Sequence, residues 1–137
     1  MAALFGHGAE TGSVRDWPRA HWDFGLIAEN EDGQPIGAAW WRQFGGAPIG
    51  GEASTWREVF LAVDSEYQGQ GLGGNLLDEL IARARAMPNT PRLIGRIVEG
   101  DERARRIQQM LVRRDFVEDR TWARFPGGSV LWSLNVQ

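Results

Sequence analysis

The chain contains no cysteine and no lysine, and it has only one tyrosine, Tyr67, and two histidines, His7 and His21. Without cysteine there can be no disulfide framework, no thiolate metal site and no thiol nucleophile. Without lysine there can be no Schiff-base lysine and no Walker-type phosphate loop ending in Gly-Lys. The two histidines give a His-based metal cage or a Ser/His/Asp triad little material. Chemistry here must use carboxylates, the backbone or a cofactor, and we predict no metal site.

Long apolar runs are also missing. No segment approaches the roughly 20 apolar residues of a membrane-spanning helix, and the N-terminus lacks the basic start and apolar core of a signal peptide. With 137 residues, of which 42% are apolar and 24% charged, the chain has the size and composition of one globular domain. We therefore predict a single domain over residues 1–137, located in the cytoplasm and without a membrane partner.

The net charge of -3 is unevenly distributed along the chain. Residues 83–124 carry 11 Arg against 6 acidic residues, whereas the remainder carries 4 Arg against 12 acidic residues. This pattern does not support a domain-wide basic surface, so we predict no nucleic-acid partner. It does suit a local basic face for a small, multiply phosphorylated ligand. For any single Arg, a solvated helix face is the alternative interpretation.

The pattern of apolar residues predicts an α/β domain built on one sheet. Residues 1–23 show no sustained period and are interpreted as a short N-terminal arm. Segments 24–30 and 36–44 flank an Asp-Gly turn, which is the signal for an antiparallel hairpin. The remaining predicted elements are a Gly-rich loop over 45–55, a strand over 57–63, a helix over about 71–86, a strand over 92–98, a helix from Asp101, and an antiparallel pair over 116–119 and 129–136. This order predicts a central mixed, mostly antiparallel sheet with two helices packed against it.

The strand over 57–63 is followed by a Gly-rich turn that leads directly into an amphipathic helix. The turn, residues 68–73, reads Gln-Gly-Gln-Gly-Leu-Gly. Glycine permits positive φ and lets a ligand approach the main chain, so N–H groups at the helix N-terminus can converge on a phosphate oxygen. A Gly-rich turn alone is more often structural. The helix directly behind it favours a ligand site, and a pyrophosphate is the natural occupant.

A dinucleotide fingerprint is the alternative interpretation of this turn. Gly69, Gly71 and Gly74 also fit G-x-G-x-x-G, and Glu99 could serve as the ribose-binding acid. A dinucleotide fold begins with this unit and needs several further βα units, yet only 38 residues follow Glu99. The upstream hairpin also has no place in that fold, so the dinucleotide alternative is the weaker of the two.

From the hairpin to the C-terminus, the sequence resembles the Gcn5-related N-acetyltransferase (GNAT) superfamily. Residues 63–84, VDSEYQGQGLGGNLLDELIARA, look like the acetyl-CoA motif of that family, and residues 92–98 with the following helix look like its second CoA motif. The resemblance implies a GNAT-like fold, acetyl-CoA as co-substrate, and an active cleft where the strands over 57–63 and 92–98 diverge. The main-chain groups that would hold the CoA pyrophosphate are those of Gln68, Gly69, Gln70, Gly71, Leu72 and Gly73.

Two further contacts to the cofactor follow from the same resemblance. The main chain of Leu61 and Val63 would pair with the pantetheine arm, and the Leu61 N–H would polarise the thioester carbonyl. Arg103 or Arg106 would contact the outer phosphates.

The chain also departs from the family pattern. Leu111 stands where many members place a general-acid Tyr, Ala104 where they open the helix with Asn, and Asp115 where they usually have Gly. The thiolate of CoA leaves readily because a thiol pKa is about 8.5, so transfer can proceed with a proton taken from water. The alternative is a non-catalytic CoA-binding or scaffold domain of the same fold.

The candidate base is Glu58, near the start of the strand that leads to the phosphate turn. The alternative interpretation is an ordinary acid at an exposed strand end, paired with Arg57 or Arg42. Glu52 on the preceding loop is a second candidate base. Because no Cys, Lys or Ser/His pair is positioned to form an acyl-enzyme, we predict direct attack by the amine in a ternary complex.

The acceptor side carries an unusual number of tryptophans. Trp40, Trp41 and Trp56 could clamp an apolar or cationic amine, although each is more often core filler. Alternation places Trp40 and Trp41 on opposite faces of a strand. The predicted partner is a small-molecule amine or a peptide amine, and the sequence leaves open whether the chain forms a homodimer.

Overall fold

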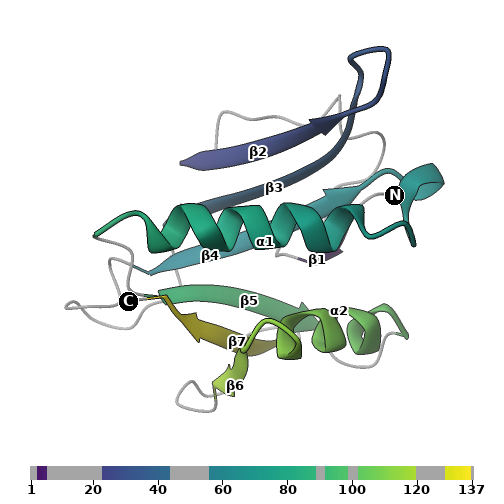
Figure 1. The fold of residues 1–137 in the computed structure, drawn as a ribbon. Helices are drawn as coiled ribbons and strands as arrows, with labels where there is room; N and C mark the ends of the chain where they lie inside the picture. The colour runs from purple at the N-terminus through teal and green to yellow at the C-terminus, as the bar shows by residue number, and fades with distance from the viewer. Residues whose placement is uncertain are drawn as a thin grey trace.

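A computed structural model describes residues 3–5, 23–43, 56–88, 92–98, 102–119 and 129–136 of the chain (Figure 1). The strands before the glycine turn are β1 Ala3–Phe5, β2 Phe24–Glu29, β3 Pro35–Gln43 and β4 Arg57–Val63. A 3-10 turn over Ser65–Tyr67 follows β4. The remaining elements are α1 Leu72–Arg85, β5 Arg92–Val98, α2 Glu102–Val112, β6 Val117–Asp119 and β7 Ser129–Asn135.

The described strands form one seven-stranded sheet with the order β2-β3-β4-β5-β7-β6, and β1 pairs with β4. β4 and β5 are parallel, and every other described pair is antiparallel. The predicted hairpin closes through Gly33, whose φ of 77° favours glycine. The sequence-based prediction of a mixed, mostly antiparallel sheet with two helices is confirmed.

Both helices pack on one face of this sheet. In β4, the side chains of Val59, Leu61 and Val63 join the helix-side core, because alternate residues of a strand point to the same face. Leu77 and Leu80 of α1 are fully buried against them, as the helical spacing of the apolar residues predicts.

The opposite face of the sheet has its own small cluster of buried residues. Trp40 and Phe60 stack there with ring centroids 5.5 Å apart, next to the cross-strand pair Ala38 and Ala62. Trp41 belongs to the helix-side core, where it packs on Phe24 with centroids 4.9 Å apart. The predicted placement of Trp40 and Trp41 on opposite faces is therefore confirmed.

The backbone after α2 is left-handed at Asp115, the position where the resembled family usually has glycine. Asp115 has φ of 67°, the left-handed conformation. The N–H of Phe116 donates to Leu111 O at 3.0 Å, and the N–H of Asp115 donates to Val112 O at 3.1 Å. These two bonds form a Schellman motif, whose left-handed position is usually glycine. Aspartate is one of the few other residues that tolerate this conformation.

Replacing Asp115 with Gly should stabilise the fold by up to about 1 kcal/mol, since it removes the left-handed strain and an acid from a helix C-terminus. Urea unfolding of the two proteins measures the difference. A variant less stable than the parent would show that the Asp115 side chain makes a compensating contact.

Candidate active site

The sheet opens between β4 and β5. These parallel strands pair only at Arg57 with Leu93 and at Glu58 with Ile94, and beyond those residues their pairing ends. Figure 1 shows the two strands diverging from this point toward their C-terminal ends. The divergence lies where the sequence predicted an active cleft, and it leaves one edge of β4 without β5 from Val59 onward.

The main-chain groups of Leu61 and Val63 face this open edge. The N–H of Asp64 donates to Ile36 O at 2.8 Å, so Asp64 faces β3. Main-chain polar groups alternate between the two edges of a strand, so Val63 and Leu61 face away from β3. The Val63 carbonyl accepts from Gln68 Nε2 at 2.8 Å, so a side chain of the turn bonds this group in the structure. The two residues predicted to pair with pantetheine thus present their main chain on one edge.

The glycine turn opens the helix α1 without a side-chain cap. Gly71 is the N-cap residue with φ of 84°, and no side chain accepts from the first turn. Gly69 also adopts a left-handed φ of 82°. The first intrahelical bond runs from the N–H of Asn75 to Gly71 O, at 3.0 Å. The N–H groups that precede it have no intrahelical acceptor, and the first turn holds no acidic residue, so this helix end favours an anion.

The side chains of the two glutamines in the turn are directed at the backbone. Gln68 bonds to Val63 O, and Gln70 Nε2 donates to Glu66 O at 3.4 Å. Neither brings a charge to the helix end. A ligand phosphate at this position would rely on main-chain N–H groups and the helix dipole.

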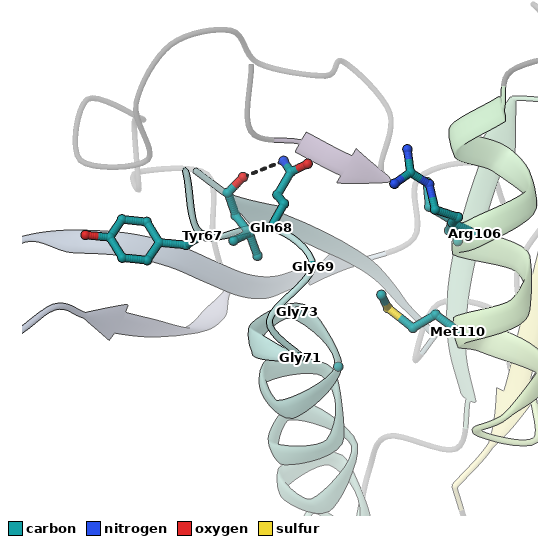
Figure 2. Close-up of a pocket in the computed structure, with 10 residues that line it drawn as sticks. Tyr67, Gln68, Gly69, Gly71, Gly73, Arg106 and Met110 are labelled. Atoms are coloured by element: carbon teal, nitrogen blue, oxygen red, sulfur yellow. Dashed lines mark hydrogen bonds between the residues drawn. The ribbon is translucent and has the colours of Figure 1, made fainter. Parts of the chain in front are cut away.

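A pocket of about 210 Å³ separates this turn from α2. Figure 2 shows Met110 and Arg106 on α2, across the pocket from the glycine turn. Arg106 is exposed and supplies a positive charge on that side. The residues that line the pocket are Val63, Tyr67, Gln68, Gly69, Gly71, Gly73, Gly74, Arg106, Ile107 and Met110. Most of the predicted pyrophosphate residues and one of the two predicted arginines therefore surround one cavity.

An ion pair fixes the relation of the two helices that border the pocket. Arg114 Nε lies 2.7 Å from Asp78 Oδ1 of α1, and Arg114 Nη1 donates to Met110 O at 3.0 Å. A Cβ at Gly74 would lie 2.5 Å from Arg114 Nη2, so a side chain there would displace this guanidinium. The pair thus links the middle of α1 to the residues that follow α2.

Glu58 is buried, with 2% of its surface exposed, which corrects the interpretation of an acid at an exposed strand end. Alternation along β4 places its side chain on the face opposite the helices, with Phe60. Its partner in the structure is Arg96 of β5: Nε lies 3.4 Å from Oε2, and Nη2 donates to Oε1 at 3.4 Å. Arg42, one of the two expected partners, lies opposite Glu58 in the β3–β4 register.

The N-terminal segment contributes a strand that the sequence did not predict. β1 pairs with β4, with Ala3 opposite Ala62 and Phe5 opposite Leu61. Because β3 pairs with β4 along its whole length, β1 must use the edge that faces β5. Figure 1 shows β1 in the gap between β4 and β5. The main-chain edge at Leu61 is therefore engaged by the chain itself.

A comparison of the sequence with models of known protein families gives a match. The model of the acetyltransferase (GNAT) family matches residues 4–109, a range that includes β4, the glycine turn, α1 and β5. The chain belongs to this family. The resemblance seen in the sequence is thereby confirmed, while no curated protein matches the chain significantly.

Solved GNAT structures share the fold. A phosphinothricin acetyltransferase of Sinorhizobium meliloti in complex with acetyl-CoA has a TM-score of 0.63 and 19% identity, and the match covers 81% of this chain and 60% of that one. An Escherichia coli GNAT family N-acetyltransferase in complex with CoA has a TM-score of 0.63 and 21% identity, and the match covers 85% of this chain and 61% of that one. A ribosomal-protein-alanine N-acetyltransferase of Brucella melitensis has a TM-score of 0.61 and 28% identity, and the match covers 80% of this chain and 65% of that one. The matches thus span 60% to 65% of these neighbours.

Within this GNAT domain, the position expected for a general acid is apolar. Leu111 is fully buried in the helix-side core, and Ala104 packs against that core. Tyr67, the only tyrosine in the chain, lines the pocket, but its ring points away from α2 in Figure 2. The general-acid tyrosine that other members have at this position is therefore replaced by Leu111 on α2.

Several predicted residues fall outside the described part of the GNAT domain. They are Glu52, Asp101 and the side chain of Arg103. Trp56 is described, and the guanidinium of Arg92 lies 4.9 Å from its ring centroid. Among the described residues, no cluster of His, Asp or Glu could hold a metal ion. No helix in the described ranges is long and apolar enough to span a membrane.

Proposed function

We propose that this GNAT domain transfers an acetyl group from acetyl-CoA to a primary amine by direct attack in a ternary complex. The observation that carries the proposal is the alignment of three features along β4. The uncapped helix end and its pocket stand at the Val63 end of the strand. The edge at Leu61, which β1 occupies in this structure, follows, and Glu58 stands where β4 meets β5. The family match and the CoA-bound neighbours support the same cofactor.

In this proposal, the pyrophosphate of acetyl-CoA binds the main chain of residues 68–73, with Arg106 near the outer phosphates. The pantetheine arm runs along the β4 edge past Val63 to Leu61. From Val63 to Glu58 the strand covers roughly 17 Å at its usual rise, which an extended pantetheine arm can span. The thioester then lies beside Leu61, whose N–H can polarise its carbonyl. Glu58 stands roughly 10 Å further along β4, at the closed end of the gap, and is reached through water.

The chemical step needs one base and no acyl-enzyme. The amine nitrogen attacks the thioester carbonyl carbon, the C–N bond forms, and the C–S bond breaks. The proton of the amine passes to the Glu58 carboxylate through water, and the CoA thiolate takes a proton from water because no tyrosine acid stands on α2. Proximity of the two reactants supplies most of the acceleration.

The proposal extends to the acceptor. The predicted acceptor is a small-molecule amine or a peptide amine, and neighbours named for phosphinothricin and for a ribosomal-protein alanine represent both classes. Nucleic acid is not a proposed partner. The cytoplasmic location and the oligomeric state stay predictions from the sequence.

Two measurements test the proposal together. Calorimetric titration should show tighter binding of acetyl-CoA than of NAD, and a preference for NAD would favour the dinucleotide alternative. A screen of small amines and peptide N-termini should then find acceptors that cause thiol release from acetyl-CoA. Binding of acetyl-CoA without thiol release for any amine would favour the second candidate, a non-catalytic CoA-binding or scaffold domain. Leu111 at the acid position and β1 on the pantetheine edge favour that candidate.

The proposed cofactor site and β1 compete for one edge. Pantetheine and residues 3–5 cannot both pair with Leu61, so we expect acetyl-CoA to displace β1 from β4. Amide hydrogen exchange at residues 3–5 should become faster at saturating acetyl-CoA, because these amides lose their strand partner. Residues 131–133 of β7, which pair with β5 and β6, serve as the internal control and should not change. Unaltered protection at residues 3–5 would mean that pantetheine does not use this edge.

A further inference from the structure

We propose that Arg96 is the positioning residue of the base, holding the Glu58 carboxylate ionised and in place on the sheet face opposite the helices, at the closed end of the gap between β4 and β5. This inference rests on the proposed function, in which Glu58 takes the proton of the amine. The resemblance that suggested Glu58 says nothing about Arg96, which stands 38 residues further along the chain.

The geometry of the pair follows from the strand register. Glu58 lies opposite Ile94 in the last residue pair of the parallel strands. Arg96 is two residues beyond Ile94, so it shares the face of Glu58 and reaches back across the start of the gap. Its Nε and Nη2 approach the two different oxygens of the carboxylate, each at 3.4 Å. The Nη2–Oε1 contact is a hydrogen bond and the Nε–Oε2 contact is an ion-pair approach, so the guanidinium orients the carboxylate from one side.

Burial makes the pairing consequential. The side chains of Glu58 and Arg96 are 3% and 11% exposed. A carboxylate removed from water favours its neutral, protonated form unless an opposite charge lies close by. The Arg96 guanidinium supplies that opposite charge beside the carboxylate. A protonated Glu58 could not accept the proton of the amine, and Arg96 therefore keeps the base in its working form.

The other charges facing Glu58 in the described residues are arginines with aromatic contacts of their own. On β3, Arg42 lies opposite Glu58, and its guanidinium is 4.7 Å from the Phe60 ring centroid. On β5, Arg92 shares the face of Arg96, with its guanidinium over the Trp56 ring. Arg96 is distinguished from both by its contacts with the two carboxylate oxygens. We therefore assign the positioning role to Arg96 rather than to the general positive charge of this face.

The experiment compares Arg96→Met, Arg96→Lys, Glu58→Gln and the double variant Glu58→Gln/Arg96→Met with the parent protein. Two readouts are taken: the titration of the Glu58 carboxyl by ¹³C NMR, and the pH profile of kcat/KM for acetyl transfer. The signal missing from the Glu58→Gln spectrum assigns the carboxyl resonance. Arg83→Met is the matched control, because Arg83 forms an exposed ion pair with Glu79 on α1.

The sign of the expected shift follows from the loss of a cation. Without Arg96 the carboxylate is less favourable, so its titration should move to higher pH. The acid limb of the rate profile should move with it, by about 1 to 3 pH units in Arg96→Met. Arg96→Lys should show a smaller shift, since lysine keeps the charge but not the planar fork. Arg83→Met should shift neither readout.

The double variant separates positioning from a purely structural role. If Arg96 acts through Glu58, Arg96→Met should cost nothing further in kcat once Glu58 is Gln. An equal loss in both backgrounds, or an unmoved acid limb in Arg96→Met, would overturn the inference. If Arg96→Met alone does not fold, the titration of Arg96→Lys and the kcat of the double variant relative to Glu58→Gln still test the inference. The double variant should fold, because it leaves no unpaired buried charge.

Failure of the proposed function looks different. Should Glu58→Gln acetylate at the full rate, the base assignment is wrong and the inference falls with it. Should Glu58→Gln be slow while Arg96→Met titrates like the parent, only the role of Arg96 is refuted.

Discussion

Glu58→Gln is expected to lower kcat for acetyl transfer by about 10²-fold and to leave the affinity for acetyl-CoA unchanged. Glutamine has nearly the shape of glutamate and can still accept from Arg96, but it cannot take a proton from the amine. The cofactor contacts proposed for residues 61–73 do not involve the carboxylate, so binding should persist. Initial rates over a range of acetyl-CoA concentrations, with calorimetry for the affinity, measure the two effects separately.

Glu79→Gln is the matched control for this prediction. Glu79 is an acid on α1 that pairs with Arg83 at 4.0 Å. Its side chain is exposed, whereas that of Glu58 is buried. Its substitution should change neither rate nor affinity. If Glu58→Gln kept full activity across a pH series, the base would have to be water or Glu52.

Gly71→Val should weaken acetyl-CoA binding by at least about tenfold, equivalent to 1.4 kcal/mol. Gly71 lines the pocket and caps α1 with φ of 84°, a conformation that costs a β-branched residue about 1 to 2 kcal/mol. The chain can relieve that strain only by shifting the N–H groups that would hold the pyrophosphate. A new side chain would also enter the space between the turn and α2.

Gly33→Val provides a control with the same backbone strain. Gly33 has φ of 77°, and a Cβ at either glycine would meet no atom within 4 Å. Both variants should lose similar stability, because the strain is the same in kind. Only Gly71→Val should lose affinity in a calorimetric titration. Equal affinities in Gly71→Val and the parent would count against the pyrophosphate site.

Most of the fold could be predicted from local sequence patterns. The strands over 57–63 and 92–98 have the bounds predicted from their apolar runs, and α1 differs from its predicted range by one residue at each end. Alternation alone separated Trp40 from Trp41. These features depend on neighbours in the sequence, where periodicity is informative.

The features that could not be predicted from the sequence depend on contacts between distant segments. The partner of Glu58 follows from the parallel register of β4 and β5, and no local pattern marks Arg96. β1 has only three residues, too few for a periodic signal, and its pairing with β4 spans more than 50 residues of sequence. The bond from Gln68 to Val63 O likewise depends on the fold of the turn. The positive φ of Asp115 could have been inferred, since this position follows a helix and is usually glycine in the family.

The most direct test of the account is to follow both products of the reaction by mass. The protein is incubated with acetyl-CoA and an amine identified in the screen, and thiol release, the mass of the amine and the mass of the protein are measured together. The account predicts one acetylated amine for each thiol released and an unchanged protein mass at every time point, because transfer is direct. Acetyl groups trapped on the protein on the way to the amine, or thiol release without any acetylated amine, would contradict it.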